Sequence, residues 1–108
     1  MYEKSPKVKN KKHLIYVSTL KCCLAKVDYF GCSHVIQAHH LLKPEYGVRG
    51  MGMKASDNNA VPLCQHHHTL LHDKFGNEDE FWVKFGLSKD YGRKMAKDIW
   101  RRSPHKNT

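Results

Sequence analysis

The sequence predicts a small α+β domain in which two short strands are followed by a helix, with further helices on either side. Residues 35–42 have the composition of a strand, and residues 58–63 contain a second strand that can pair with the first. A helix is expected over residues 65–74, ending before Gly76. The chain has 108 residues, which allows one domain with a modest core, and domains of this size often add a metal or a disulfide.

The segment before the first strand predicts a short helix. Leu14, Val17 and Leu20 are three residues apart and favour a helix with one apolar face over residues 13–20. Residues 15–17 are prone to form a strand, so a short strand is an open alternative. In either case we expect the apolar side chains to pack into the core.

Two more helices are expected in the last third of the chain. Asn77 and Glu80 can cap a helix that runs to about Phe85, and Gly86 breaks it. A final helix is expected over residues 90–102, because apolar side chains recur there at helical spacing. These side chains, which we expect in the core, are Tyr91, Met95, Ile99 and Trp100.

The chain is strongly basic, with a formal charge of +9 from 19 Lys and Arg against 10 Asp and Glu. This excess favours polyanionic partners such as nucleic acid or an anionic membrane surface. No apolar run is long enough to span a bilayer, and the first residues lack the apolar core of a signal peptide. We therefore expect no membrane insertion and no export, and a cytoplasmic location.

The two ends of the chain are expected to lie outside the domain. Residues 1–12 are rich in Lys and almost without apolar side chains, which predicts a disordered basic arm. Such an arm adds salt-dependent attraction to phosphates if it contacts nucleic acid. The alternative is a solvated tail or a cloning remnant. The domain is expected over residues 13–103, and residues 104–108 form a second tail.

A glycine-rich loop is expected over residues 43–57. Glycine lets backbone N–H groups approach a phosphate closely, and Arg49 and Lys54 add positive charge, so these two residues are candidates for DNA binding. The alternative is a flexible surface loop. The three glycines are Gly47, Gly50 and Gly52.

Four histidines form a pattern that can support metal chemistry. His68 and His72 are four residues apart on the expected helix, so they share a face and can chelate a transition metal. His39 and His40 start on opposite faces of the expected strand. Either the end of the strand brings both to one metal centre, or one binds the metal while the other faces the substrate.

Phosphodiester hydrolysis needs groups of this kind. A water must lose a proton, and negative charge must be stabilised on the scissile phosphate and on the leaving oxygen. A divalent cation can stabilise the charge, and a neutral imidazole can take the proton. Histidine suits this second role because its unperturbed pKa is about 6.5.

The order of these residues resembles a known family. The chain has AHH, then N-x-VPLC-x-HHH-x-x-x-H, within the segments GMGMKASDNNAVPLC and HHHTLLHDKFGNEDEFW. This order resembles the HNH endonucleases, also called His-Me finger or ββα-metal nucleases, and is similar to phage-encoded members including the Ref-type nucleases. The resemblance covers about residues 13–100, and its specific part is residues 38–72.

The resemblance implies a ββα-metal finger with flanking helices that cuts DNA with little sequence specificity and uses one divalent cation, Mg²⁺, Mn²⁺, Ni²⁺ or Zn²⁺. It implies that His40 is the general base. It also implies that Asn59 holds the base-bearing hairpin and helps to orient His40. The metal ligands that it implies are His39, His68 and His72.

The resemblance also implies a structural zinc, because many HNH domains bind one through two Cys-x-x-Cys pairs. Cys64 and His67 take the place of the second pair. The first pair is irregular, since Cys22 and Cys23 are adjacent and Cys32 lies further along. The expected ligands are Cys23 (or Cys22), Cys32, Cys64 and His67, with His34 as another candidate. The alternative is that the thiols are small buried apolar groups.

Two other classes of function remain open. One is a zinc-stabilised module that binds nucleic acid without cutting it. The presence of both His40 and the helix pair argues against this class. The other is a phage packaging or replication accessory subunit that acts only with a phage or host partner protein. Activity that needs an added partner would favour this second class.

Overall fold

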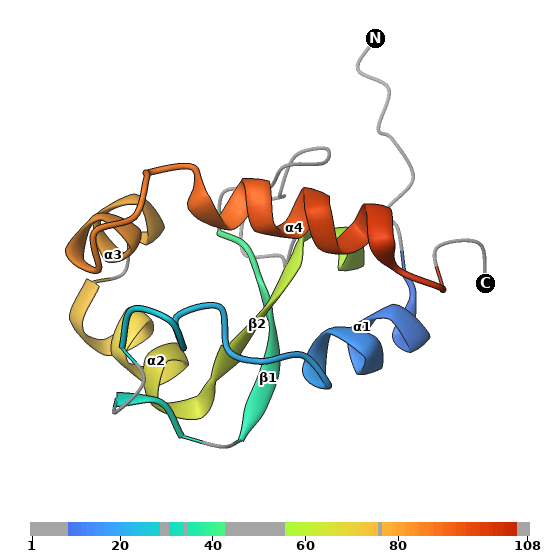
Figure 1. The fold of residues 1–108 in the computed structure, drawn as a ribbon, viewed down its shortest axis with the longest axis horizontal. Helices are drawn as coiled ribbons and strands as arrows, with labels where there is room; N and C mark the ends of the chain where they lie inside the picture. Colours follow the sequence, from blue (N-terminus) through green and yellow to red (C-terminus); the bar gives the residue numbers. More distant parts are fainter. Residues whose placement is uncertain (1–8, 29–30, 34, 43–55, 76, 106–108) are drawn as a thin grey trace, which may run out of the picture.

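The computed structural model describes residues 9–28, 31–33, 35–42, 56–75 and 77–105, and it is an α+β fold (Figure 1). Its sheet has two antiparallel strands within these residues, β1 (Ile36–His40) and β2 (Ala60–Cys64). The helices are α1 (Lys11–Ser18), α2 (Gln65–Leu70), α3 (Glu78–Lys84) and α4 (Tyr91–Arg102), and two shorter helical segments are η2 (Asp57–Asn59) and η3 (Leu71–Phe75). The predicted fold class and the predicted strand–strand–helix order are therefore confirmed.

The first helix, α1, settles the open choice between helix and strand. Asn10 is its N-cap, because its side-chain Oδ1 accepts a hydrogen bond from the backbone N–H of His13 at 3.0 Å. The helix consequently includes Lys11 and Lys12, which were expected in the basic arm. Residues 1–8 of that arm and residues 106–108 of the tail lie outside the described residues.

Two groups of buried side chains pack against the two sides of the sheet. The larger contains Val61 and Leu63 from β2 and Leu41, which follows β1, together with Phe81 and Trp82 from α3. The smaller fastens α1 and α4 to the strands; its buried members are Val17, Ala60 and Ile99. Because both sides are covered, every residue of β2 is buried, which fixes the sheet as the rigid base of the molecule.

The chain after β2 runs directly into helix. The expected helix over residues 65–74 is present as α2 followed by η3, a π-helical turn. Asn77 caps α3 as predicted, since its Oδ1 accepts from the backbone N–H of Asp79 at 2.9 Å. Gly86 ends α3 with φ at +79°, a conformation that favours glycine. None of the described helices has the length and apolar composition needed to cross a membrane.

Candidate functional site

The pleat of β1 directs the two neighbouring histidines to opposite faces of the sheet. His39 points to the side of α2 and α3, where it contacts the rings of His68 and His72. His40 points to the side of α1, where it contacts Asp57. Of the two alternatives for this pair, the structure therefore supports separate environments.

The first cluster of metal-binding side chains joins β1 to α2 and η3. Each of His39, His68 and His72 offers one ring nitrogen, and these nitrogens all lie within 4.8 Å of one another. Ring centroids of His68 and His72 are 4.5 Å apart. His39 is 3% exposed, His68 is half-buried and His72 is exposed. The three imidazoles could hold a metal ion that still faces solvent on the His72 side.

Local structure explains why the helical histidines reach His39. The pair His68 and His72 spans the junction between α2 and η3, and π-helical turns often mark functional sites. Residues four apart share a helical face, so both rings point back to the strand. His68 and His72 therefore share a face, as their spacing predicts, although the helix changes from α to π between them.

The electrostatics of this cluster favour the neutral form of His68. Burial lowers the pKa of His68, and positive charge on His39 or His72 lowers it further. The Nε2 of His39 is 2.7 Å from Oε2 of Glu78, and both side chains are 2% exposed. A histidine that binds a metal through one ring nitrogen commonly donates the other to a carboxylate. Glu78, the first residue of α3, is in the place of that carboxylate.

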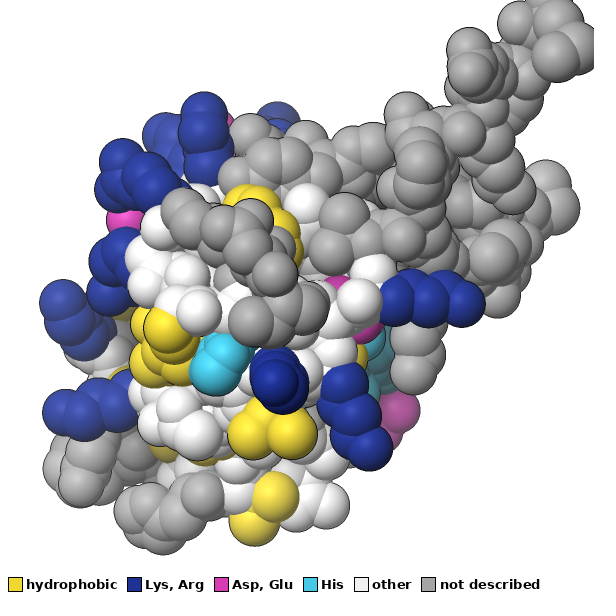
Figure 2. Space-filling model, turned by 90° about the vertical axis from the view of Figure 1, so that its right-hand side faces the viewer, with side chains coloured by type: hydrophobic (Ala, Val, Ile, Leu, Met, Phe, Trp, Pro, Cys, Tyr) yellow, Lys and Arg dark blue, Asp and Glu magenta, His cyan; other side chains and the backbone are white. Residues whose placement is uncertain are grey.

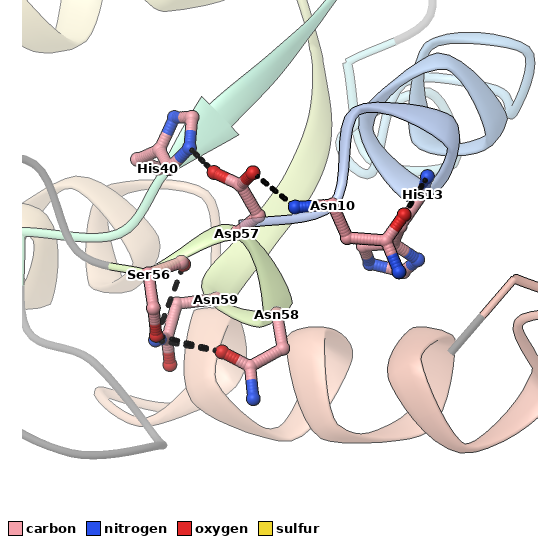
Figure 3. A network of polar contacts seen from close by, with 7 residues as sticks. All are labelled: Asn10, His13, His40, Ser56, Asp57, Asn58 and Asn59. Atoms are coloured by element: carbon pink, nitrogen blue, oxygen red, sulfur yellow. Dashed lines mark hydrogen bonds and ion pairs between the residues drawn. The ribbon is translucent and has the colours of Figure 1, made fainter. Parts of the chain in front are cut away.

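On the other face of the sheet, the ring of His40 points to a carboxylate (Figure 3). Its Nε2 is 2.9 Å from Oδ1 of Asp57, the first residue of η2. The second carboxylate oxygen, Oδ2, accepts a hydrogen bond from the backbone N–H of Asn10 at 2.7 Å. The side chains of His40 and Asp57 are 15% and 18% exposed, so the pair is sheltered but accessible to water.

Asn59 is the last residue of η2, directly before β2, and is fully buried. Its backbone carbonyl accepts from the N–H of Leu41, the residue after His40, at 3.0 Å. Its side-chain Nδ2 donates to Oγ of Ser56 at 3.0 Å. The expected role of Asn59 in holding the hairpin agrees with these contacts, whereas the hydrogen bond to the ring of His40 comes from Asp57.

A second cluster contains three cysteines and one histidine. Its donor atoms, within 4.8 Å of one another, belong to Cys22, Cys32, Cys64 and His67. Nδ1 of His67 is 3.7, 3.4 and 3.1 Å from the three sulfurs in that order. Tetrahedral zinc places sulfur and nitrogen ligands about 3.6 Å apart. The cluster is therefore compatible with a structural metal such as zinc, and all four cysteines of the chain are free of disulfides.

The expected ligand set named Cys23, but the structure brings Cys22 to the cluster. Cys23 donates its backbone N–H to the carbonyl of Pro62 on β2 at 2.9 Å, and its side chain is buried in the core. Sγ of Cys22, in the preceding residue, lies in the cluster and accepts the N–H of Cys64 at 3.3 Å. The other candidate, His34, lies outside the described residues.

The two adjacent thiols have opposite acidities. A hydrogen bond with Cys23 lowers the pKa of Cys22 to about 4. The same hydrogen bond, together with burial, raises the pKa of Cys23 well above its usual range. Burial also raises the pKa of Cys32, which is in the cluster, so the choice of Cys22 over Cys23 rests on the position of its sulfur and not on acidity.

Asp28 supports the second cluster from outside. Its Oδ2 is 2.7 Å from Nε2 of His67, so the other ring nitrogen faces the sulfurs. Gly31 leaves the room for this carboxylate, since a Cβ there would collide with it. Burial lowers the pKa of His67, but hydrogen bonds to Asp28 and Cys22 outweigh burial and raise it.

Three carboxylates thus hold site histidines, and motif reasoning missed all three. Asp28, Asp57 and Glu78 are 39, 17 and 39 residues from the histidines that they contact. No short spacing could have pointed to them. The DNA-binding candidates Arg49 and Lys54, and the glycines around them, lie outside the described residues.

The family of the chain follows from its comparison with known proteins. Residues 1–97 match the family described as Protein of unknown function (DUF968). The chain belongs to this family. The matched region of this DUF968 member includes every donor of both clusters and the three carboxylates. The uncharacterized protein YdfU of Escherichia coli strain K12 is 41% identical over 54 residues, which cover 44% of this chain and 15% of that relative. No solved structure matches the chain.

Proposed function

We propose that this chain is a metal-dependent endonuclease that hydrolyses phosphodiester bonds of DNA with little sequence specificity. The observation that carries the proposal is the pair of neighbouring histidines on β1 with different partners. His39 joins two helical imidazoles in a cluster of metal-binding type, and His40 faces a carboxylate. Consecutive Cα atoms are about 3.8 Å apart, so the metal-binding group and the proton acceptor come from adjacent positions at the end of β1, on its two faces.

The three imidazoles fit Ni²⁺ or Zn²⁺ best, and Mn²⁺ and Mg²⁺, which prefer oxygen ligands, are further candidates. Three protein ligands leave positions for water and for a phosphate oxygen, as in catalytic sites. When bound, the cation would supply positive charge at the scissile phosphate and at the leaving oxygen. This role requires accessibility, and the exposed ring of His72 provides it.

His40 supplies the proton transfer. It takes a proton from the attacking water at the ring nitrogen that does not face Asp57. The water oxygen forms the new bond to phosphorus, and the bond from phosphorus to the leaving sugar oxygen breaks with its electron pair. A proton from solvent completes the leaving hydroxyl.

The cluster of three cysteines and His67 is proposed to hold a structural zinc. Its four donors, three of them buried, leave no position for a substrate. A zinc there ties the segment around Cys22 and Cys32 to the entry of α2. Structural zinc sites contribute about 10–16 kcal/mol of apparent binding energy to folding in small domains.

The basic surface is proposed to bind the DNA backbone. The face in Figure 2, on the side of α1 and the C-terminal end of α4, carries Lys and Arg side chains at its edge and centre. Lys11 and Lys12 of α1 and Arg101 and Arg102 of α4 are exposed. Contacts of such side chains to phosphates position a duplex without reading its bases, and the DNA would be reached in the bacterial cytoplasm.

The test is cleavage of supercoiled plasmid by full-length protein. The protein is treated with EDTA at a concentration that leaves its circular dichroism spectrum unchanged, and then Mg²⁺, Mn²⁺, Ni²⁺ or Zn²⁺ is added separately, with His40→Ala beside the wild type. His66→Ala is the matched control, because His66 is exposed on α2 and belongs to neither cluster. We expect nicking that a metal restores in the wild type and control but not in His40→Ala.

Other results would move the function to another class. Tight DNA binding without cleavage under any metal would indicate a zinc-stabilised binding module. Cleavage that needs an added phage or host protein would indicate an accessory subunit. An equal cleavage rate in His40→Ala and the wild type would show that His40 is not the general base.

A further inference from the structure

We propose that Asp57 is a positioning residue for His40, and that the N-terminal cap of α1 holds Asp57 in place. The inference rests on the proposed function, since it explains how the base is oriented. Neither Asp57 nor Asn10 belongs to the motif that pointed to the site. Both were found through contacts that join three separate parts of the chain (Figure 3).

The contact between Asp57 and His40 selects one form of the imidazole. A carboxylate oxygen accepts hydrogen bonds, so the 2.9 Å contact to Nε2 places a hydrogen on that nitrogen. The other nitrogen, Nδ1, then carries the lone pair and can accept a proton from water. Without its carboxylate partner, the ring could adopt either tautomer and rotate about its bond to Cβ. Asp57 therefore controls which atom faces the substrate.

The orientation of Asp57 is itself determined by α1. The backbone N–H of Asn10, 47 residues away in sequence, donates to Oδ2 of Asp57 at 2.7 Å. The two carboxylate oxygens thus have separate partners, which fixes the plane of the carboxylate. A charge-assisted hydrogen bond of this kind is stronger than one between neutral groups. The start of α1 is consequently connected to the base through one side chain.

The position of Asn10 is fixed because its side-chain oxygen and nitrogen also form hydrogen bonds. Its side-chain Oδ1 accepts from the N–H of His13 and caps α1. Its Nδ2 donates to the carbonyl of His105, after the end of α4, at 2.6 Å. Asn10 is 6% exposed. It therefore links the first and last described helices to the residue that orients His40.

A second set of bonds fixes the turn that carries Asp57. The N–H and Nδ2 of Asn59 donate to the carbonyl and Oγ of Ser56, both at 3.0 Å. Oγ of Ser56 donates to Oδ1 of Asn58 at 2.7 Å. The carbonyl of Asn59 also accepts from Leu41 next to the base. The asparagine of the motif thus acts on His40 through the turn of Asp57.

An ion pair that only stabilises the fold would leave the chemistry of His40 unaffected. A positioning carboxylate would change the tautomer of the ring and the rate of the chemical step, with substrate binding unaltered. These two readouts separate the alternatives. Loss of an orienting carboxylate without loss of geometry can cost a factor of about 10⁴ in kcat in a histidine-based site.

The variant for the test is Asp57→Asn, which retains the size of the side chain. Its single amide oxygen can serve either His40 or Asn10, and its NH₂ group must face the other. When the NH₂ group faces Nε2, it favours the tautomer that has its hydrogen on Nδ1. Asp57→Glu is the conservative variant. Asp90→Asn is the matched control, because Asp90 pairs with the exposed Lys94 of α4 at 3.5 Å, and neither residue belongs to a donor cluster or to the proposed DNA-binding surface.

The kinetic experiment uses full-length protein loaded with zinc and Mn²⁺ and a short DNA duplex. We expect kcat to fall on the order of 100-fold in Asp57→Asn, with KM within about twofold. Asp57→Glu should recover part of the loss, and Asp90→Asn should match the wild type. Circular dichroism and the zinc content should be the same for all four proteins.

The spectroscopic experiment reads the ring directly. ¹H–¹⁵N correlation spectra of the histidine side chains give the tautomer of each ring, and His40→Gln identifies the signals of His40. We expect the hydrogen on Nε2 in the wild type and in Asp90→Asn. We expect a mixture, or the Nδ1 form, in Asp57→Asn.

The outcomes separate the inference from the proposed function. A wild type that cuts DNA, with unchanged kcat and ring tautomer in Asp57→Asn, would overturn the role of Asp57 alone. A wild type that cuts nothing would overturn the proposed function and the catalytic role of Asp57 with it. A folded Asp57→Asn with both changes would establish the positioning role.

Discussion

The two donor clusters of this protein lie on one scaffold and have opposite designs. The cysteine cluster, Cys22, Cys32, Cys64 and His67, has four donors, three of them in buried residues. The histidine cluster, His39, His68 and His72, has three donors that range from buried to exposed. Four donors complete a tetrahedral shell around zinc, whereas three leave a position for substrate. Closure and burial are compatible with a structural metal such as zinc, and the incomplete, accessible set is the one that we propose to hold a catalytic metal.

The clusters also share one feature, a carboxylate that contacts one of their histidines. In each, a carboxylate from another segment holds one histidine, Asp28 on His67 and Glu78 on His39, at 2.7 Å in both cases. Such a carboxylate orients the ring and raises its basicity as a ligand. The difference between the clusters therefore lies in the number and exposure of the donors, and the support of the histidines is alike.

The largest expected effect is the loss of folding when a ligand of the cysteine cluster is removed. Cys64→Ala should remove the structural zinc and with it most of the cooperative fold, because zinc binding contributes directly to folding in small domains. Circular dichroism and metal analysis of the purified protein give the readouts.

The neighbouring cysteines provide the matched comparison for this result. Cys22→Ala should behave like Cys64→Ala, whereas Cys23→Ala should retain zinc and lose about 1 kcal/mol of stability from the packed core. Zinc lost from Cys23→Ala and retained in Cys22→Ala would reverse the ligand assignment.

A chelator should remove the metal of the histidine cluster before it removes the zinc of the cysteine cluster. With rising EDTA, we expect DNA cleavage to stop first, while the circular dichroism spectrum is unchanged, because three imidazoles hold a metal less tightly than three thiolates and an imidazole. Unfolding should follow at higher chelator concentration, when zinc leaves. Loss of fold and of cleavage at the same concentration would show that the clusters do not differ in this way.

In the histidine cluster, His72→Ala should reduce cleavage on the order of 100-fold or more, since it removes one of the three proposed ligands of the catalytic metal. Because His72 is exposed, the free energy of unfolding should change by less than about 1 kcal/mol. Thermal melts and plasmid nicking measure the two effects, with His66→Ala as the control. A large drop in melting temperature would make the cluster structural.

The smallest effects are expected from the supporting carboxylates. Glu78→Gln should weaken the catalytic metal about 10- to 100-fold, and Asp28→Asn should weaken the zinc by a similar factor. Each variant should leave the other metal unaffected. Metal titrations of the two variants test this, and a change of both affinities in either variant would show that the clusters are coupled.

Local patterns were enough to predict one part of the site. Spacing alone places His68 and His72 on one helical face and His39 and His40 on opposite strand faces, because the periods of helix and strand depend only on the backbone. The caps at Asn77 and Gly86 follow from similarly short-range hydrogen bonds and backbone preferences.

Other features depend on contacts between distant segments. The choice of Cys22 over Cys23 follows from the pairing of the Cys23 backbone with Pro62 on β2. The carboxylate partner of His40 comes from a turn 17 residues away, and the cap of α1 that holds it lies 47 residues from that turn. Short spacings carry no signal for such pairs, since packing of the helices on the sheet brings them together.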